Sequence, residues 1–385
     1  MNIIEYARSF PYTFSESPFS EVDSLILSQL AYLNLGEMAG YRLRQMEDLI
    51  EDPTSVVPRS HAEDNLQLLE AVGDSVRFGN LRLLGQESVR QSTPACQFNA
   101  SAWEAANMLI VVYRGTDGSL IGWRENFDFL TGYAVRAHAL SVDFLERWAS
   151  KTDLPILVCG HSKGGHLALY AAAHCAPQVF DRIRCVYNHD GPGITSANWD
   201  KERLDALLPR MHRTVPEASV FGLMLEDYAP MNVVVAQAQG LMQHYPYTWQ
   251  IEEDGRFARG KALSKGAKLV DSVLEDMKAN LTDEDRQELV DALFGVLEAS
   301  GVEMLADLES PATRKLLVSK GRELPPQTRK RAWSLLRLIV AEAAGNAADY
   351  TSELMKEKWR KMRQARAARK AEKEIAATKP ADEEE

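Results

Sequence analysis

One short stretch near the middle of the chain constrains the fold more than any other feature. Residues 158–172 read VCGHSKGGHLALYAA and directly follow the apolar residues PIL at 155–157. A short apolar run bounded by turn residues is typical of a buried strand, and an alanine-rich run favours a helix. The glycines between them allow a sharp turn. The stretch therefore predicts a strand, a tight turn and a helix in immediate succession, with Ser162 in the turn.

Other strand-like runs alternate with helical patterns, which predicts the fold class α/β. The predicted strands are NLRLLG at 80–85, ACQFNASAW at 95–103, MLIVVY at 108–113, PILVCG at 155–160, IRCVYNHD at 183–190, ASVFGLMLED at 218–227 and MNVVVA at 231–236. Alternating strands and helices indicate a mostly parallel central sheet flanked by helices on both faces. The closely spaced first strands indicate an antiparallel first edge.

The predicted core domain occupies residues 1–255 and begins with a helical segment. A helix is expected within 18–36, where Ser20 and Asp23 form a capping-box pattern. Residues 37–76 are charged and interrupted by proline. We expect them to form a surface helical segment, or a lid over a pocket.

The strand signal stops beyond about residue 255, and the rest of the chain is predicted to be helical. Residues 256–355 form a helical C-terminal region in which Thr282 and Asp285 resemble a helix cap. Residues 356–385 form a charged tail with few apolar residues. This tail is predicted to be a solvated helix that ends in disorder.

Composition excludes several classes of partner. The net charge is −11, which gives no general attraction to nucleic acid or to an anionic membrane. No apolar stretch is long enough for an integral membrane segment, and the N-terminus lacks a signal-peptide pattern. The four cysteines are irregularly spaced and form no metal-binding pattern. We expect a cytoplasmic protein that needs no metal or organic cofactor.

Residues 160–164 form the pattern GxSxG, in which Ser162 is a candidate nucleophile. Gly160 and Gly164 permit a strained turn that exposes the serine, and His161 lies between Gly160 and Ser162 in the same turn. A phosphate-binding P-loop needs a longer spacing between its glycines and its lysine, so the spacing here argues against that motif. The other alternative is a glycine-rich turn with an idle serine.

A serine nucleophile needs a histidine base, and His244 fits best by order along the chain. In this architecture the order is serine, acid, histidine. The other histidines outside the turn precede Ser162, lie on the helix after it, or precede the last candidate acid: His61, His138, His166, His174, His189 and His212. His244 lies in the loop-like sequence GLMQHYPYTW at 240–249. The alternative for His244 is a histidine packed among aromatic residues.

The acid that orients the histidine has two candidates. Asp227 closes the predicted strand at 218–227, where a carboxylate at the top of the sheet is expected, and we favour it. Asp190, which closes the strand after the turn–helix, is the alternative acid. A turn-forming aspartate is the other interpretation of both, and it suits Asp190 before Gly-Pro-Gly well.

Two backbone donors are needed to stabilise an oxyanion. One is expected to be the N–H of Lys163, directly after the nucleophile. The second is expected from the loop in VVYRGTDGS at 111–119, where Thr116 offers both an N–H and a hydroxyl. The alternative is a polar turn without a catalytic role.

These motifs resemble those of known proteins. YRGTD at 113–117 and GHSKGG at 160–165 resemble segments of class 3 (fungal-type) lipases. The ordered set, which also includes CQFNAS at 96–101, YNHDGPG at 187–193 and LMQHYPYTW at 241–249, is similar to the Mbeg-like family, a bacterial group of unassigned function. The resemblance covers about residues 15–255.

The resemblance implies an α/β-hydrolase fold with Ser162 as nucleophile, His244 as base, and Thr116 and Lys163 as oxyanion donors. It also implies a carboxylate near Asp227, although the sequence LEDYAP departs from the Asp-x-Val-Pro segment usual in class 3 lipases. We therefore expect a lipase-like or esterase-like hydrolase whose partner is a small-molecule ester or a lipid. The alternative is an inactive hydrolase-fold protein that binds a partner. The sequence leaves the oligomeric state open.

Overall fold

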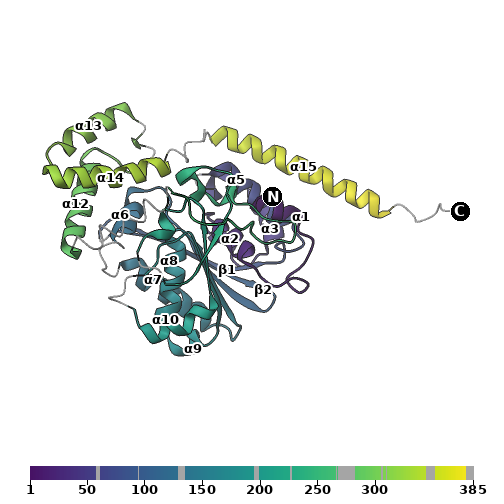
Figure 1. Cartoon of the computed structure of the whole chain (residues 1–385). Coiled ribbons are helices and arrows are strands. Elements are labelled where there is room, and N and C mark those ends of the chain that lie inside the picture. The colour runs from purple at the N-terminus through teal and green to yellow at the C-terminus, as the bar shows by residue number, and fades with distance from the viewer. Residues whose placement is uncertain are drawn as a thin grey trace.

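The computed structural model describes residues 1–385 except 58–60, 94, 129–134, 195–198, 226–227, 266, 268–281, 305–306, 309, 344–351 and 379–385. Its centre is a seven-stranded sheet in the order β1-β2-β3-β4-β5-β6-β7 (Figure 1). The strands are β1 Arg82–Gln91, β2 Cys96–Ala105, β3 Met108–Tyr113, β4 Ile156–His161, β5 Ile183–His189, β6 Met211–Pro216 and β7 Met231–Val234. β1, β2 and β3 pair antiparallel, and β3 to β7 are parallel. The predicted α/β class and antiparallel edge are confirmed.

Both faces of the sheet are covered, because the central strands are apolar on both sides. In β4, Val158 packs with the helices α7 (Arg136–Ala149) and α8 (Lys163–His174), whereas Leu157 and Cys159 pack with the N-terminal helices on the other face. Alternate residues of a strand point to opposite faces, so one apolar run serves two cores. The remaining helices beside α7 and α8 are α9 (Pro177–Phe180) and α10 (Lys201–Leu207).

The N-terminal segment forms a helical layer that reaches one end of the sheet. It contains α1 Ile3–Ser9, α2 Glu21–Leu30, the 3-10 helix η1 Gly36–Met38, α3 Leu43–Leu49, α4 Pro53–Val56 and α5 Ala62–Asp74. The predicted capping box of α2 is present, because Ser20 and Asp23 each bond the other's backbone N–H. Asp23 also forms a fully buried ion pair with Arg77 at 2.6 Å. This layer is therefore fixed to the core by polar as well as apolar contacts.

The C-terminal region is helical, as predicted, and packs against the core. It comprises α12 Asp283–Ala299, α13 Pro311–Gly321 and α14 Pro326–Ala343. Thr282 caps α12 in a capping box with Asp285. A single apolar cluster joins α12, α13 and α14 to α6 (Leu120–Asp128) and to residues near Phe221. The three helices lie beside α6 in Figure 1.

The charged tail forms a long helix, α15 (Ser352–Thr378), which runs along α5 (Figure 1). It is not a solvated helix throughout, because Trp359 is buried against α4 and α5 and its arginines form ion pairs with the N-terminal layer. Arg366 pairs with Glu47 and Asp74, and Arg369 with Glu70. Within the described ranges, no helix is both long and apolar enough to span a bilayer.

The predicted strand at 218–227 is wrong in its described part. The strand after β5 is β6, Met211–Pro216, and Phe221–Leu223 form the 3-10 helix η5. β6 contains Arg213 and Thr214, which are buried but polar, so its sequence lacks the apolar run of a central strand. The remaining 3-10 helices are η4 Leu208–Arg210, η6 Gly240–His244 and η7 Pro246–Thr248.

Candidate active site

Ser162 occupies the turn between β4 and α8 in a strained conformation. Its φ is 57° and its ψ is −131°, a backbone conformation that residues other than glycine rarely adopt. The turn needs its glycines: a Cβ at Gly160 would lie 2.2 Å from the carbonyl of Gly164, and one at Gly164 would lie 2.0 Å from the carbonyl oxygen of Tyr113. Close packing therefore fixes the turn and holds the serine at the start of α8.

His244 lies in η6 and is held by a buried carboxylate. Its Nδ1 is 2.6 Å from Oδ2 of Asp190, which is fully buried at the end of β5. The other carboxylate oxygen of Asp190 accepts hydrogen bonds from the hydroxyl of Ser219 and, at 3.1 Å, from the N–H of Gly222. Because Asp190 has three donors around it, its position relative to the histidine is well defined.

The acid that contacts His244 is thus the alternative that sequence reasoning ranked second. Asp227, the favoured candidate, lies outside the described residues. The ranking depended on a strand at 218–227, and the described residues of that range form η5 and a turn instead. Asp190 has a φ of 48°, which agrees with a turn-forming residue. The same residue therefore forms the turn and contacts His244 through its carboxylate.

His161, the residue before the serine, links the turn to the segment of His244. Its Nε2 donates a hydrogen bond to the carbonyl oxygen of His244 at 3.0 Å, and the two imidazole centroids are 4.5 Å apart. Burial holds the pKa of His161 well below its usual range, so the ring is neutral. Sequence reasoning treated His161 only as part of the motif. No local signal marks a contact across 83 positions of sequence.

Lys163 has separate roles for its backbone and its side chain. Its backbone N–H begins α8, next to Ser162, and its role as an oxyanion donor stays a prediction. Its ammonium is fully buried and lies 2.9 Å from Oε2 of Glu125 on α6 and 3.0 Å from Oε1 of Gln97. The side chain therefore anchors α6 to the start of α8.

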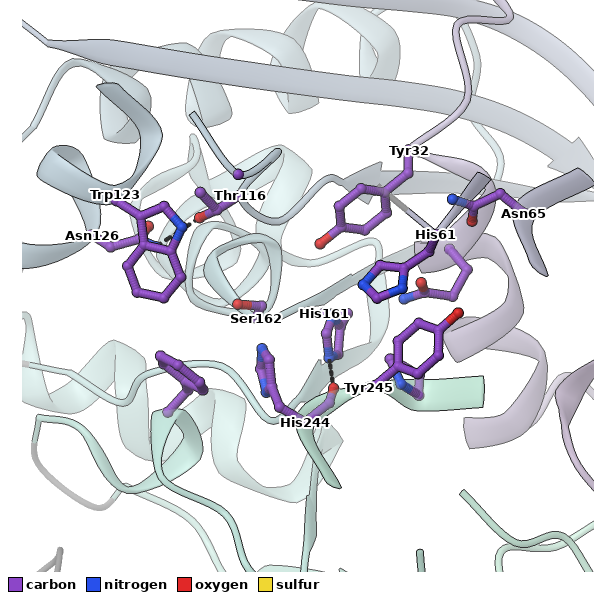
Figure 2. Close-up of a pocket in the computed structure, with 14 residues that line it drawn as sticks. Tyr32, His61, Asn65, Thr116, Trp123, Asn126, His161, Ser162, His244 and Tyr245 are labelled. Atoms are coloured by element: carbon purple, nitrogen blue, oxygen red, sulfur yellow. Dashed lines mark hydrogen bonds between the residues drawn. The ribbon is translucent and has the colours of Figure 1, made fainter. Parts of the chain in front are cut away.

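The loop that contains Thr116 packs directly against the serine. A Cβ at Gly115 would lie 3.2 Å from Cβ of Ser162, so the loop passes close to the serine and leaves little room for a side chain. Asn126 donates to the hydroxyl of Thr116 at 2.7 Å. A hydroxyl that accepts this bond keeps its own proton available for donation. In the view of Figure 2, Ser162 lies between Thr116 and His244.

The serine and the histidine line one pocket (Figure 2). Its wall includes His61 and Asn65, which come from the segment 37–76 that the sequence marks as a possible lid. The ring of His61 stacks on Tyr245 with centroids 3.9 Å apart. Burial, with the nearby His244, lowers the pKa of His61 to about 4. The pocket therefore has a neutral imidazole opposite the candidate base.

A second, apolar cavity also reaches Ser162. It is lined by Trp123, Asn126, Phe127, Ser162, Lys163, Pro192, Val220, Phe221, Met224 and Leu335. The apolar sequence at 220–224, which suggested a strand, forms part of this lining. In the described part of the chain, no group of three or more His, Cys, Asp or Glu side chains is arranged to hold a metal ion.

A strained serine between a parallel strand and a helix, at the carboxyl ends of the strands, defines an α/β-hydrolase fold. The Mbeg1-like family model matches residues 72–295, and the chain belongs to this family. The match extends from the end of α5 into α12 and includes every residue of the predicted site. No curated protein matches the chain.

Several solved lipase structures are similar to this chain. The M37 lipase is 13% identical and has a TM-score of 0.37, with 78% of this chain and 98% of that chain covered. A mutant of MDLA from Penicillium cyclopium has the same identity and TM-score, with 68% and 94% covered. The Rhizomucor miehei lipase–propeptide complex is 13% identical with a TM-score of 0.36, and 68% and 76% are covered.

Proposed function

We propose that this chain is a serine hydrolase that cleaves carboxylic esters through an acyl-enzyme. The observation that supports this most is one linked set of residues. Ser162 is strained at a strand–helix turn, His244 lines the same pocket, and Asp190 contacts the far nitrogen of that histidine at 2.6 Å. An exposed polar turn has no need of a buried carboxylate behind a histidine, whereas an activated serine does.

The hydrogen bond to Asp190 decides which nitrogen of His244 acts as the base. Because Nδ1–H donates to the carboxylate, Nε2 of the neutral ring has no proton and can accept one. In the first step Nε2 takes the hydroxyl proton of Ser162 while Oγ attacks the ester carbonyl. The tetrahedral intermediate then collapses, the bond to the alcohol oxygen breaks, and that oxygen receives the proton from His244.

The second step repeats the same chemistry with water. His244 accepts a proton from the water, whose oxygen attacks the acyl carbon bound to Ser162. When the carbon–Oγ bond breaks, His244 returns the proton to Ser162 and the carboxylic acid leaves. The two steps regenerate Ser162 and the neutral His244, and the proposed reaction uses neither a metal nor an organic cofactor.

The oxyanion donors in this proposal are Lys163 and Thr116. The N–H of Lys163 is the first of α8, where the helix dipole favours negative charge. Thr116 adds a donor from the loop that contacts Ser162, and its hydroxyl is oriented by Asn126. Removal of one oxyanion donor typically costs about 10²- to 10³-fold in kcat.

Labelling with a fluorophosphonate probe tests the proposal directly. The wild type is expected to label, and Ser162→Ala is expected not to, because the probe reacts with an activated serine. Ser150→Ala is a suitable control, since this exposed serine at the end of α7 is outside the candidate site and its variant should still label. Absence of labelling in a folded wild type, with a circular dichroism spectrum of mixed helix and sheet, would contradict the proposal.

A pair of aspartate variants identifies the acid. Asp190→Asn is expected to lower kcat by about 10⁴-fold, because an amide cannot hold the histidine in the productive tautomer. Asp227→Asn is expected to change kcat less than about threefold. The reverse result would restore Asp227 as the acid. Both variants keep the side-chain volume, so thermal unfolding should separate a loss of folding from a loss of chemistry.

A further inference from the structure

Ser162 lines two adjoining cavities that differ in polarity. One is lined mainly by apolar side chains, among them Phe127, Val220, Met224 and Leu335. The other, which we call the polar pocket, has a mixed lining of aromatic side chains and of polar side chains that include Gln29 and Asn65. An ester has its two halves on opposite sides of its carbonyl carbon. A nucleophile that lines both an apolar cavity and a more polar pocket therefore suits an ester with one apolar and one more polar half.

Of the residues that line the apolar cavity, Leu335 lies furthest from Ser162 along the sequence. It comes from α14, in the C-terminal region, and is 4% exposed. α14 packs against η6, which contains His244, and against α12, which packs on α6. The C-terminal helices thus complete the cavity beside the serine rather than forming a separate appendage.

The polar pocket contains a buried donor that a ligand can satisfy. Gln29, on α2, is 5% exposed, and its Nε2 has no hydrogen-bond partner among the described residues. A buried amide without a partner is destabilising, so an oxygen that accepts a hydrogen bond from it is bound more tightly. The hydroxyl of an alcohol leaving group is such an oxygen.

We infer that the substrate is an ester of an aliphatic acid with a hydroxyl-bearing alcohol, and that Leu335 sets the length of the acyl chain. The acyl chain occupies the apolar cavity and ends against Leu335. The alcohol occupies the polar pocket, where Gln29 Nε2 donates to one of its hydroxyls. This inference rests on the proposed function, because both halves are placed relative to attack by Ser162.

Two neighbouring leucines of α14 provide a matched test of the acyl cavity. Leu335 and Leu336 are both buried in the same apolar cluster, at 4% and 6% exposed, but of the two only Leu335 lines the cavity. Leu335→Ala and Leu336→Ala should therefore destabilise the fold to a similar extent. The measurement is kcat/KM on p-nitrophenyl esters from acetate to decanoate, which share one leaving group.

Leu335→Ala is expected to move the preferred acyl chain to a longer one. The ratio of kcat/KM for octanoate to that for butyrate should rise about tenfold, which is the order of discrimination that one or two methylene groups provide in an apolar pocket. In Leu336→Ala this ratio should stay within about twofold of the wild type. An unchanged ratio in Leu335→Ala, or equal changes in both variants, would overturn the assignment of the cavity.

The polar pocket is tested with two butyrate esters that share the acyl chain. Wild type is expected to prefer glyceryl butyrate to ethyl butyrate, and Gln29→Leu to lose about tenfold of that preference through KM. The p-nitrophenyl esters should be affected much less. Equal loss on all esters would overturn this role of Gln29.

These outcomes are distinguishable from failure of the proposed function. If wild type hydrolyses none of the esters and Ser162 does not react with the fluorophosphonate, the hydrolase proposal and this inference both fail. If hydrolysis depends on Ser162 but neither ratio responds to its variant, only the inference fails.

Discussion

Two parts of the C-terminal half are attached to the same core by opposite kinds of contact. α12 and α14 bury a cluster of leucines and phenylalanines against α6 and Phe221. Among its described side chains, α15 buries Trp359, packs Met362 partly against the core and forms ion pairs such as Lys358–Glu63 and Arg369–Glu70. Apolar contacts are insensitive to screening by salt, whereas partly exposed ion pairs weaken as salt rises.

The two attachments also differ in what they support. The apolar attachment lies next to the candidate active site, because the ring of Phe221 contacts that of His244 with centroids 4.4 Å apart. The ionic one lies on α3 and α5, where Glu47, Glu70 and Asp74 accept the arginines of α15. We therefore expect the first to control activity and the second to control local opening of the N-terminal layer.

The largest effect is expected at Phe294 of α12, which is fully buried between the core and the C-terminal helices. Its ring lies 5.8 Å from that of Phe127, a residue of the acyl cavity. Phe294→Ala should lower the free energy of unfolding by about 3–5 kcal/mol and reduce kcat/KM, because α6 loses its support. Urea unfolding and hydrolysis of p-nitrophenyl butyrate measure both. Val318→Ala, at an exposed position of α13, is the control. Full activity in a destabilised Phe294→Ala would break the link between apolar attachment and the site.

An intermediate effect is expected from salt. Raising NaCl from 0.1 M to 1 M shortens the Debye length from about 10 Å to about 3 Å. Amide hydrogen exchange should then quicken in α15 and stay unchanged in α12 and α14. At low salt, the double variant Arg366→Gln/Arg369→Gln should show the same faster amide exchange in α15. Arg256→Gln, which removes an exposed ion pair elsewhere, should leave exchange in α15 unchanged. Equal loss of protection in α12 would mean that the two attachments do not differ.

The smallest effect concerns pH. Burial, only partly opposed by Arg366, raises the pKa of Glu47 from 4.5 to about 7. The folded state therefore binds a proton between these values that the unfolded chain releases, so the stabilisation is complete below pH 4.5 and is lost as pH rises through 7. The Tm of wild type should fall between pH 5 and pH 8 by more than that of Glu47→Gln. Glu323→Gln, which removes the exposed pair with Lys320 just after the end of α13, should behave as wild type. An identical pH dependence of Tm in all three proteins would show that Glu47 is not its source.

The parts of the site that depend on local spacing were accessible from the sequence. The turn around Ser162 needs only a strand, small residues and a helix in succession, and residues 158–172 supply them. The loop of Thr116 follows an apolar strand in the same way. The fold class followed from the alternation of strands and helices. His244 was reached by its order along the chain.

The remaining parts depend on contacts between distant segments. Asp190 ranked second because the sixth strand, with Arg213 and Thr214 buried in it, does not look like a strand, whereas the lining at 220–224 does. Apolar character signals burial but not the element that is buried. Leu335 reaches the cavity through the packing of helices, and no motif encodes that contact.

The ion pair between Lys163 and Glu125 has a consequence for inheritance. Both side chains are fully buried, so a change at either position alone leaves a buried charge without its counterpart, at a cost of about 3–5 kcal/mol. One residue follows the nucleophile and the other lies on α6, so we expect a loss of charge at one position to be tolerated only with a matching change at the other. In related sequences we therefore expect the lysine of GHSKGG to occur together with an acidic residue in the helix that follows the YRGTD loop.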